Sequence, residues 1–246
     1  ALQKIGLRYL LPLRHGGRKH GVLLLGRKVT GVSYTGEEVS LLVTLANQVG
    51  VALQNASLYR QTLDAAVLEE ELALARKIQQ NLLPARAPEV RPFSVAARNV
   101  PSKQVGGDFY DLVDLGGGRL LLAVADVSGK GVPAAILTSM LQAALRTQLK
   151  SAGGPAEILR NLNEMVYQFT AADQFATFFL GVLDGADLTF RYANAGHNFP
   201  FVLKAGEGLE TLETGGLLLG AFPGIDWPEG SVTLAPGDTL LLYTDG

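Results

Sequence analysis

Three aspartates stand where a strand would meet a turn. Asp108 follows two glycines, Asp126 follows the apolar run 120–125, and Asp245 follows the run 240–244. A carboxylate at the tip of a buried strand is costly unless it is paired, hydrogen-bonded or bound to a metal ion. Several such tips that converge would form an all-oxygen cluster suited to Mg²⁺ or Mn²⁺. Such ions acidify a bound water and hold a phosphoryl group, which matters because phosphate monoesters hydrolyse extremely slowly unaided.

Each aspartate taken alone is also consistent with ordinary turn chemistry. Asp favours turns and helix caps. Asp126 could simply cap the turn that leads to a helix beginning at Pro133. The spacing by itself therefore leaves both a metal site and a set of structural turns open.

The segments around the aspartates mix strands with two adjacent helices. Apolar spacing predicts helices over 133–148 and 155–169. Strands are expected at 120–125, 175–183, 188–193 and 199–203, with a last pair at 232–234 and 239–243 around a Pro-Gly-Asp turn. The runs before Asp126 and Asp245 are almost wholly apolar, so both strands should be central and buried. Adjacent helices amid antiparallel-looking strands predict the α+β class.

A hairpin and a long helix are expected before this region. Two apolar runs, 9–13 and 22–26, flank a loop with two glycines. Thr35 followed by Glu38 fits a capping box at a helix start, and Pro84 ends the helical pattern.

The long helix carries a heptad-like seam. Its apolar or small residues recur at Leu42, Leu45, Val49, Ala52, Ala56, Tyr59, Leu63 and Ala66. A second phase follows at Leu68, Leu72, Ala75, Gln79 and Leu82, so a stutter or a helix break is expected between them. An ordinary amphipathic helix is the alternative. About 45 residues would extend about 68 Å, too long for one small domain, so we favour a projecting or dimeric coil.

Composition limits the classes of function. Apolar residues make up 48% of the 246 residues, which allows a sizeable core. A formal net charge of -2 gives no electrostatic case for nucleic acid or an anionic membrane. The absence of cysteine excludes disulfides, thiolate metal sites and cysteine nucleophiles, and fits a cytoplasmic location. No apolar run approaches the ~20 residues that span a bilayer.

Four segments in one order carry a family resemblance. They are residues 105–111 (VGGDFYD), 125–131 (ADVSGKG), 193–198 (ANAGHN) and 242–246 (LYTDG). Together they closely resemble the stage II sporulation protein E-like branch of the PPM protein phosphatases. The match runs from about residue 72 to the end and includes the linker phrase 71–84 (ELALARKIQQNLLP).

The resemblance implies a fold and a metal site. The fold would be a four-layer α/β/β/α sandwich of two antiparallel sheets, with two Mn²⁺ or Mg²⁺ ions at one end. Asp126 matches the carboxylate that bridges both ions, and the main-chain carbonyl of Val127 matches a further ligand. Asp108 matches a ligand to one ion and Asp245 a ligand to the other. A water held by the ions, rather than a side chain, would attack phosphorus.

Other polar residues near these motifs receive lesser roles. His197 lies where eukaryotic relatives place an aspartate near an outer metal; it is a candidate supporting residue, with a structural hydrogen-bonded role as the alternative. Lys103 occupies the place of a phosphate-binding arginine, or is a solvated surface lysine. Asp111 is expected to cap a turn or support Asp108, and Ser128 and Lys130 are expected to shape the turn after Asp126.

The N-terminal part resembles the second half of a GAF sensor domain. The supporting segments are 21–26, 34–38 and 45–56. The expected domains are a GAF remnant over 1–56, a helical linker over 57–84, and a phosphatase domain over 85–246. The family normally continues beyond a Tyr-Thr-Asp-Gly motif, so the phosphatase domain is expected to be C-terminally incomplete.

Three functions are open at this point, two from the resemblances and one, the scaffold, from the expected incompleteness of the phosphatase domain. The first is hydrolysis of phosphoserine or phosphothreonine on a regulatory protein, for this branch usually an anti-sigma factor antagonist in bacterial partner switching. The second is a non-catalytic signalling scaffold that forms a homodimer through the linker helix. The third is a ligand-sensing module built on the GAF pocket.

Overall fold

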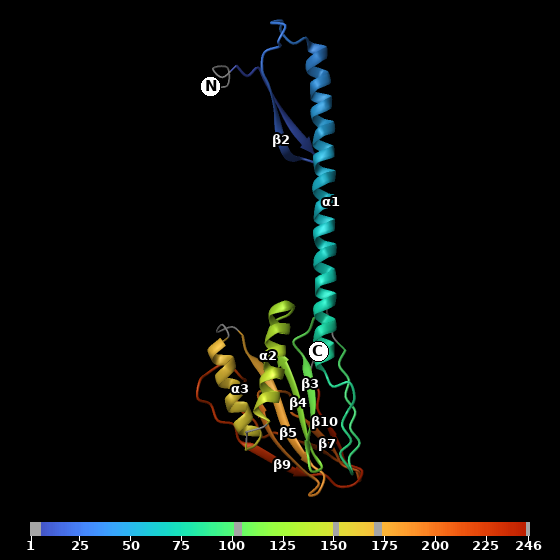
Figure 1. Ribbon diagram of the computed structural model, residues 1–246, viewed down its shortest axis with the longest axis vertical. Helices are drawn as coiled ribbons and strands as arrows, with labels where there is room; N and C mark the ends of the chain where they lie inside the picture. Colours follow the sequence, from blue (N-terminus) through green and yellow to red (C-terminus); the bar gives the residue numbers. More distant parts are fainter. Residues whose placement is uncertain (1–5, 101–104, 150–152, 170–173, 245–246) are drawn as a thin grey trace. The chain divides into compact units, whose positions relative to one another are not determined.

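The computed structural model describes residues 6–100, 105–149, 153–169 and 174–244 (Figure 1). The chain divides into two compact units, residues 1–70 and 71–246. No helix within the described ranges is long and apolar enough to cross a membrane.

The first unit contains the predicted hairpin and the start of a long helix. Strands β1 (Tyr9–His15) and β2 (Arg18–Leu25) pair antiparallel, which confirms the hairpin. Helix α1 (Gly36–Leu82) approaches β1 closely at Gly50, where an added Cβ would lie 2.7 Å from the Arg14 carbonyl oxygen. Only a residue without a side chain allows the helix backbone to lie this close to the strand.

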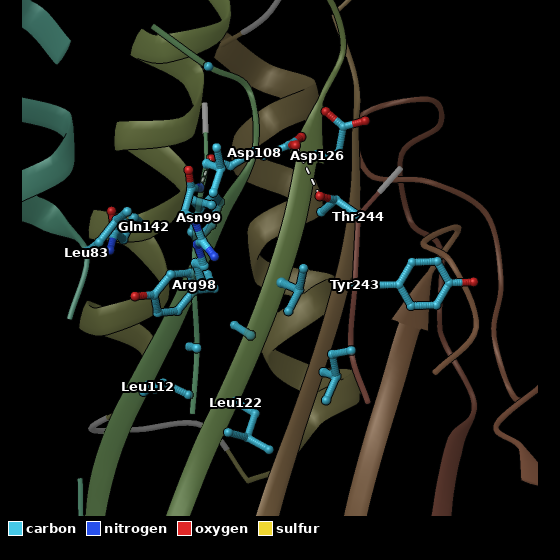
Figure 2. Close-up of a pocket in the computed structure, with 18 of the residues that line it drawn as sticks. Leu83, Arg98, Asn99, Asp108, Leu112, Leu122, Asp126, Gln142, Tyr243 and Thr244 are labelled. Carbon is cyan, nitrogen blue, oxygen red and sulfur yellow. Dashed lines mark hydrogen bonds between the residues drawn. The ribbon is translucent and has the colours of Figure 1, made fainter. Parts of the chain in front are cut away.

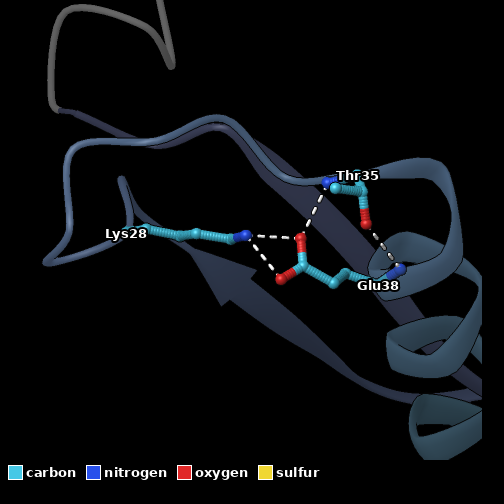
Figure 3. A network of polar contacts seen from close by, with 3 residues as sticks. All are labelled: Lys28, Thr35 and Glu38. Atoms are coloured by element: carbon cyan, nitrogen blue, oxygen red, sulfur yellow. Dashed lines mark hydrogen bonds and ion pairs between the residues drawn. The ribbon is translucent and has the colours of Figure 1, made fainter.

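The predicted capping box at the start of α1 is confirmed (Figure 3). The Thr35 hydroxyl accepts the Glu38 N–H at 3.3 Å, and the Glu38 carboxylate accepts the Thr35 N–H at 2.7 Å. Lys28 forms an ion pair with the same carboxylate. The hydrogen bond from Lys28, and then that from the Thr35 N–H, lower the pKa of Glu38. The carboxylate therefore stays ionised beside the positive end of the helix dipole.

Helix α1 is continuous through the change of seam phase. It runs without interruption from Gly36 to Leu82 and ends two residues before Pro84. The phase change is therefore no helix break. At its end, the Gln142 side-chain amide donates to the Leu82 carbonyl oxygen at 2.8 Å and satisfies one of the last carbonyls of the helix.

Two antiparallel sheets form the second unit. The five-stranded sheet has the order β3-β4-β5-β6-β9, and the three-stranded sheet has the order β10-β7-β8. The bounds of the larger sheet's strands are β3 (Phe109–Gly116), β4 (Arg119–Val127), β5 (Ala176–Asp184), β6 (Thr189–Ala195) and β9 (Glu229–Thr233). Those of the smaller sheet are β7 (Phe201–Leu203), β8 (Leu209–Thr211) and β10 (Thr239–Leu241).

The larger sheet buries both of its faces. Helices α2 (Val132–Gln148) and α3 (Pro155–Phe169) lie side by side on one face (Figure 1). In β4, Leu121 belongs to the core beneath these helices, whereas Leu120 belongs to a second core that includes Val202 of β7. This alternation is the period of a strand with two covered faces. The α+β class is confirmed, and a second helical layer is not among the described residues.

The predicted pairing of the last two strands is wrong. Strand β9 pairs with β6, and β10 pairs with β7, so the chain passes from one sheet to the other between them. Asp238 holds this crossing, because its carboxylate accepts the main-chain N–H groups of Ala205 at 3.0 Å and Ala235 at 3.1 Å. These two bonds lower the pKa of Asp238. The Pro-Gly-Asp turn therefore changes sheets instead of closing a hairpin.

Two strands, those before Asp126 and Asp245, were expected to be central, and only the first of them is central. Strand β4 lies inside its sheet, with Leu120 and Leu121 fully buried. In the part of the chain that the structure describes, β10 is the edge of its sheet, and Leu241 is 47% exposed. Apolar composition alone does not separate a central strand from an edge strand that has one covered face.

Asp111 forms a buried ion pair, so of its two expected roles, capping a turn or supporting Asp108, the turn cap is wrong. It lies within β3, fully buried, and its two carboxylate oxygens accept bonds from Arg146 Nε and Nη2 of α2, each at 2.9 Å. The Leu112 N–H donates to the same carboxylate at 2.9 Å. The bond to Asp111 raises the pKa of Arg146. The pair therefore fastens α2 to the sheet that carries Asp108.

We expect the Arg146→Met substitution to lower the free energy of unfolding by roughly 2–4 kcal/mol, because it leaves the Asp111 carboxylate buried without its cation. Asp111→Asn should cost clearly less, since the Arg146 side chain is 51% exposed and can return to water. Urea denaturation of the two variants measures the difference. Equal losses, or a larger loss for Asp111→Asn, would contradict the assignment.

Candidate metal centre

Asp108 and Asp126 face each other at one end of strands β3 and β4. The antiparallel register pairs Phe109 with Ala125, and the Val127 N–H donates to the Gly107 carbonyl oxygen at 3.3 Å. Both pairs belong to one register, which places Asp108 opposite Asp126. Side chains at opposite positions of an antiparallel pair have Cβ atoms about 4.5–5.5 Å apart. Figure 2 shows the two carboxylates at the same end of a cavity.

A glycine makes this approach possible. A Cβ added at Gly107 would lie 2.5 Å from the Val127 carbonyl oxygen and 3.4 Å from Asp126 Oδ1. The carbonyl predicted as a ligand and the predicted bridging carboxylate therefore both lie against the Gly107 backbone. The Thr138 hydroxyl of α2 donates to the Gly107 carbonyl oxygen at 2.9 Å and holds this loop in place.

The segment after β10 reaches the same site. The Thr244 hydroxyl donates to Asp108 Oδ2 at 3.1 Å, as drawn in Figure 2. Asp245 lies outside the described residues, so its role as a ligand stays a prediction. Thr244, the residue before Asp245, already contacts the Asp108 carboxylate.

The donors at the site fit a hard divalent cation. Asp108, Asp126 and the Val127 carbonyl offer only oxygen, the ligand type of Mg²⁺ and Mn²⁺. Like charges at directly opposite strand positions destabilise the pair, and a cation between them removes that cost. Among the residues that the structure describes, no three acidic or histidine side chains gather as one cluster. The described part of the site thus provides two carboxylates, not a complete ligand set.

The cavity beside the carboxylates is large and partly cationic. Its volume is about 1160 Å³, and Arg98 and Lys130 are among its lining residues. An anionic phosphoryl group would find favourable charge there. Lys103, the other basic residue considered for this role, lies outside the described residues.

Sequence reasoning missed the glutamine that links α1 to the site. The Gln79 side chain donates to the Gly106 carbonyl oxygen at 2.8 Å and accepts the Gly106 N–H at 3.3 Å. It therefore holds the loop two residues before Asp108. The signal was present in the sequence, because Gln79 is a polar residue in an otherwise apolar seam.

His197 and Ser128 support the site's turns. The Ser128 side chain accepts the Phe175 N–H at 3.0 Å, and its own N–H donates to the Phe175 carbonyl oxygen at 2.9 Å. Ser128 therefore shapes the turn after Asp126, as predicted. His197 is 6% exposed, and its ring contacts Thr177 and the Tyr243 main chain.

Comparison with known proteins defines the class of this chain. The sequence model of the family described as stage II sporulation protein E (SpoIIE) matches residues 116–246, more than half of the chain. The chain belongs to this family. Its C-terminal part is a phosphatase-type domain, and the matched residues include Asp126, Val127 and Asp245.

Individual relatives agree with the class. The phosphoserine phosphatase RsbU of Bacillus subtilis is 33% identical over 180 residues, which cover 73% of this chain and 53% of RsbU. Protein IcfG of a Synechocystis species is 28% identical, over 98% of this chain and 39% of IcfG. The chain thus spans about half the length of RsbU and less of IcfG.

Solved structures share the fold. The RsbU and RsbW domains of Rv1364c from Mycobacterium tuberculosis match with a TM-score of 0.53 and 36% identity, over 60% of this chain and 41% of that one. The SiaA-PP2C domain of Pseudomonas aeruginosa matches with a TM-score of 0.59 and 23% identity, over 72% and 71% of the two chains. The second likeness concerns the fold alone.

Proposed function

We propose that this chain provides the catalytic domain of a metal-dependent serine/threonine protein phosphatase. The observation that carries the proposal is the pair of carboxylates, Asp108 and Asp126, at facing strand-end positions beside the Val127 carbonyl in a chain of the stage II sporulation protein E family. Two Mn²⁺ or Mg²⁺ ions are the proposed cofactors, with Asp245 as a further ligand.

The residues of the chain have separate tasks in this proposal. Asp108 and Asp126 hold the cations, and the Thr244 hydroxyl orients the Asp108 carboxylate. Arg98 and Lys130 attract the phosphoryl group into the cavity. When bound, the ions supply Lewis-acid polarisation of the phosphoryl oxygens and a more acidic water. This chemistry requires no thiolate nucleophile, and the sequence contains no cysteine.

The proposed substrate is a phosphoserine or phosphothreonine of a regulatory protein. RsbU, which shares 33% identity, bears the name of a phosphoserine phosphatase, and this name supports the substrate class. Within that class we propose an anti-sigma factor antagonist in a bacterial partner-switching pathway of the cytoplasm.

The test is release of inorganic phosphate from a phosphoserine protein and from an aryl phosphate, using the longest polypeptide that contains this chain. We expect hydrolysis with Mn²⁺, its loss on chelation with EDTA, and its return when Mn²⁺ is restored. The physical reason is that the two carboxylates alone can neither polarise the phosphoryl oxygens nor acidify a water, whereas a bound cation does both. Full activity in EDTA would refute a metal-dependent reaction. No hydrolysis with excess metal would favour the alternative function, a non-catalytic signalling scaffold.

We further propose the domain organisation predicted from the sequence. The hairpin and the first part of α1 would be the C-terminal part of a GAF-like domain over 1–56, followed by a linker over 57–84. The phosphatase domain over 85–246 would adopt the family's four-layer sandwich. The two described sheets and the helices α2 and α3 support three of these layers.

A homodimer through α1 is part of the proposal. The face of α1 that packs on the hairpin includes Ala46 and Gly50, which are buried. The predicted seam lies on another face and stays exposed in the single chain: Leu45 is 44%, Val49 46% and Leu63 48% exposed. An apolar seam at heptad spacing that stays exposed among the described residues is typical of a coiled coil.

We expect the wild-type chain to have the mass of a dimer in light scattering, and the double substitution Tyr59→Glu and Leu63→Glu to give a monomer. Charges placed in the seam would have to be buried without partners. Gln61→Glu, on the opposite face of α1, is the matched control and should leave the dimer intact. A monomeric wild-type protein at tens of micromolar would contradict the proposal.

A further inference from the structure

We propose that His197 is a positioning residue for the metal centre, which holds the Tyr243–Thr244 segment at the carboxylates without binding metal itself. The proposal rests on the function proposed above. It begins from three contacts that join segments far apart in the sequence: β4 with Asp126, the start of β5, the turn after β6, and the segment after β10.

The two ring nitrogens of His197 have different partners. Nδ1 lies 2.7 Å from the Thr177 hydroxyl, and Nε2 lies 3.1 Å from the Tyr243 carbonyl oxygen. A carbonyl oxygen only accepts hydrogen bonds, so Nε2 carries the proton. In the neutral ring Nδ1 is then the acceptor, and the Thr177 hydroxyl donates to it. The contacts form a directed chain from Thr177 through His197 to the Tyr243 main chain.

This assignment explains why His197 does not act as a metal ligand. A histidine binds metal through a ring nitrogen with a free lone pair. The Nε2 lone pair is absent because that atom is protonated, and the Nδ1 lone pair accepts the Thr177 hydroxyl. The resemblance places an aspartate of eukaryotic relatives at this point, whereas here the ring binds protein on both sides.

The two ends of this series of contacts lead to the two residues that bear the carboxylates, at Asp126 through its main chain and at Asp108 through its side chain. Thr177 pairs with Asp126 in the β4–β5 register. Its hydroxyl also lies 3.5 Å from the Asp126 carbonyl oxygen, a longer contact that competes for the same single hydrogen. At the other end, Tyr243 precedes Thr244, whose hydroxyl donates to Asp108. His197 therefore connects the strand of one carboxylate to the segment that holds the other.

The turn that carries His197 is built to keep the ring in place. The Asn194 side chain accepts the His197 N–H at 2.7 Å and donates to the His197 carbonyl oxygen at 3.0 Å. Between them Gly196 has a φ of 67°, a left-handed conformation that favours glycine. Asn194 and His197 are 1% and 6% exposed. A ring held at both its main chain and its nitrogens has one orientation.

The experiment compares Mn²⁺ affinity, measured by calorimetry on the metal-free protein, with thermal stability. We expect His197→Ala to weaken Mn²⁺ binding by roughly 10–100-fold, the usual effect of removing a group that orients a metal site. Thr177→Val, which removes only the hydroxyl, should weaken binding in the same direction. His197→Gln should recover part of the affinity, because its amide can donate to the Tyr243 carbonyl oxygen.

Asn163→Ala is the matched control for a purely structural loss. Asn163 is fully buried in α3 and bonds the Phe222 carbonyl oxygen and the Gly220 N–H, and it does not line the cavity that holds the carboxylates. It should lower stability and leave Mn²⁺ affinity unchanged. A Mn²⁺ affinity of His197→Ala within about twofold of wild type, or an equal loss in Asn163→Ala, would overturn the positioning role while the proposed function stands.

A second readout is independent of metal. Long-range ¹H–¹⁵N correlation of the histidine rings in the metal-free protein should show His197 protonated at Nε2, with His197→Gln used for assignment among three histidines. A ring protonated at Nδ1 alone would overturn the proposal. A wild-type protein that shows the Nε2–H ring but takes up no Mn²⁺ would instead refute the proposed function, and with it the metal-positioning role.

Discussion

Asp126→Asn will reduce metal-dependent phosphate release by about 10²–10⁴-fold, because a catalytic cation supplies several kcal/mol of charge stabilisation and each 1.4 kcal/mol is a factor of ten in rate. Asparagine has nearly the same shape and keeps one oxygen, but it removes the charge that faces Asp108 across β3 and β4. The measurement is kcat and the Mn²⁺ activation constant, together with the melting temperature.

Asp184→Asn is the matched control for this substitution. Asp184 ends β5 at the opposite end of the same sheet, and its carboxylate accepts the Ala186 N–H in a turn. It should leave both kinetic constants near their wild-type values. Retention of full activity by Asp126→Asn would end the metal-centre account, whereas a comparable loss in both variants would point to general damage to the sheet.

Gly107→Ala will disable the site through the backbone, without replacing a proposed ligand side chain. The added Cβ would lie 2.5 Å from the Val127 carbonyl oxygen, so the ends of β3 and β4 must separate. A displacement of about 1 Å can cost roughly 10²-fold in rate, and overpacking of this kind costs about 1–3 kcal/mol of stability. Activity, Mn²⁺ affinity and urea denaturation measure the three consequences.

The neighbouring glycine supplies the control. A Cβ added at Gly106 would meet nothing closer than the Asp108 main-chain nitrogen at 3.9 Å, an ordinary contact. Its two hydrogen bonds to Gln79 use main-chain atoms and survive the substitution. Gly106→Ala should therefore behave nearly as wild type. If the two variants lose activity equally, the close approach at Gly107 is not what the site depends on.

The local features of this protein were predictable from its sequence. The capping box of Thr35 and Glu38 and the helices over Val132–Gln148 and Pro155–Phe169 follow from short-range spacing. The positions of Asp108 and Asp126 at strand ends were predicted from a glycine pair and an apolar run, respectively. The structure places the two residues opposite each other.

Long-range partners were not predictable in this way. Nothing in the spacing of β9 and β10 shows that they join different sheets, because a Pro-Gly-Asp turn is compatible with a hairpin as well as with a crossing. The local sequence around Asp111 indicates a turn residue, and it does not reveal the ion pair with Arg146, which is distant in the sequence. Gln79 and His197 likewise gain their roles only from contacts with Gly106, Thr177 and Tyr243.

The most direct test of the account is Mn²⁺ binding to the metal-free protein. Calorimetry measures the binding, and so does the loss of the electron paramagnetic resonance signal of free Mn²⁺. The account predicts that the wild-type protein, in the longest polypeptide that contains this chain, takes up two ions and that Asp126→Asn abolishes or strongly weakens the uptake. No uptake by the wild type, or uptake that Asp126→Asn leaves unchanged, would contradict a metal centre at Asp108 and Asp126.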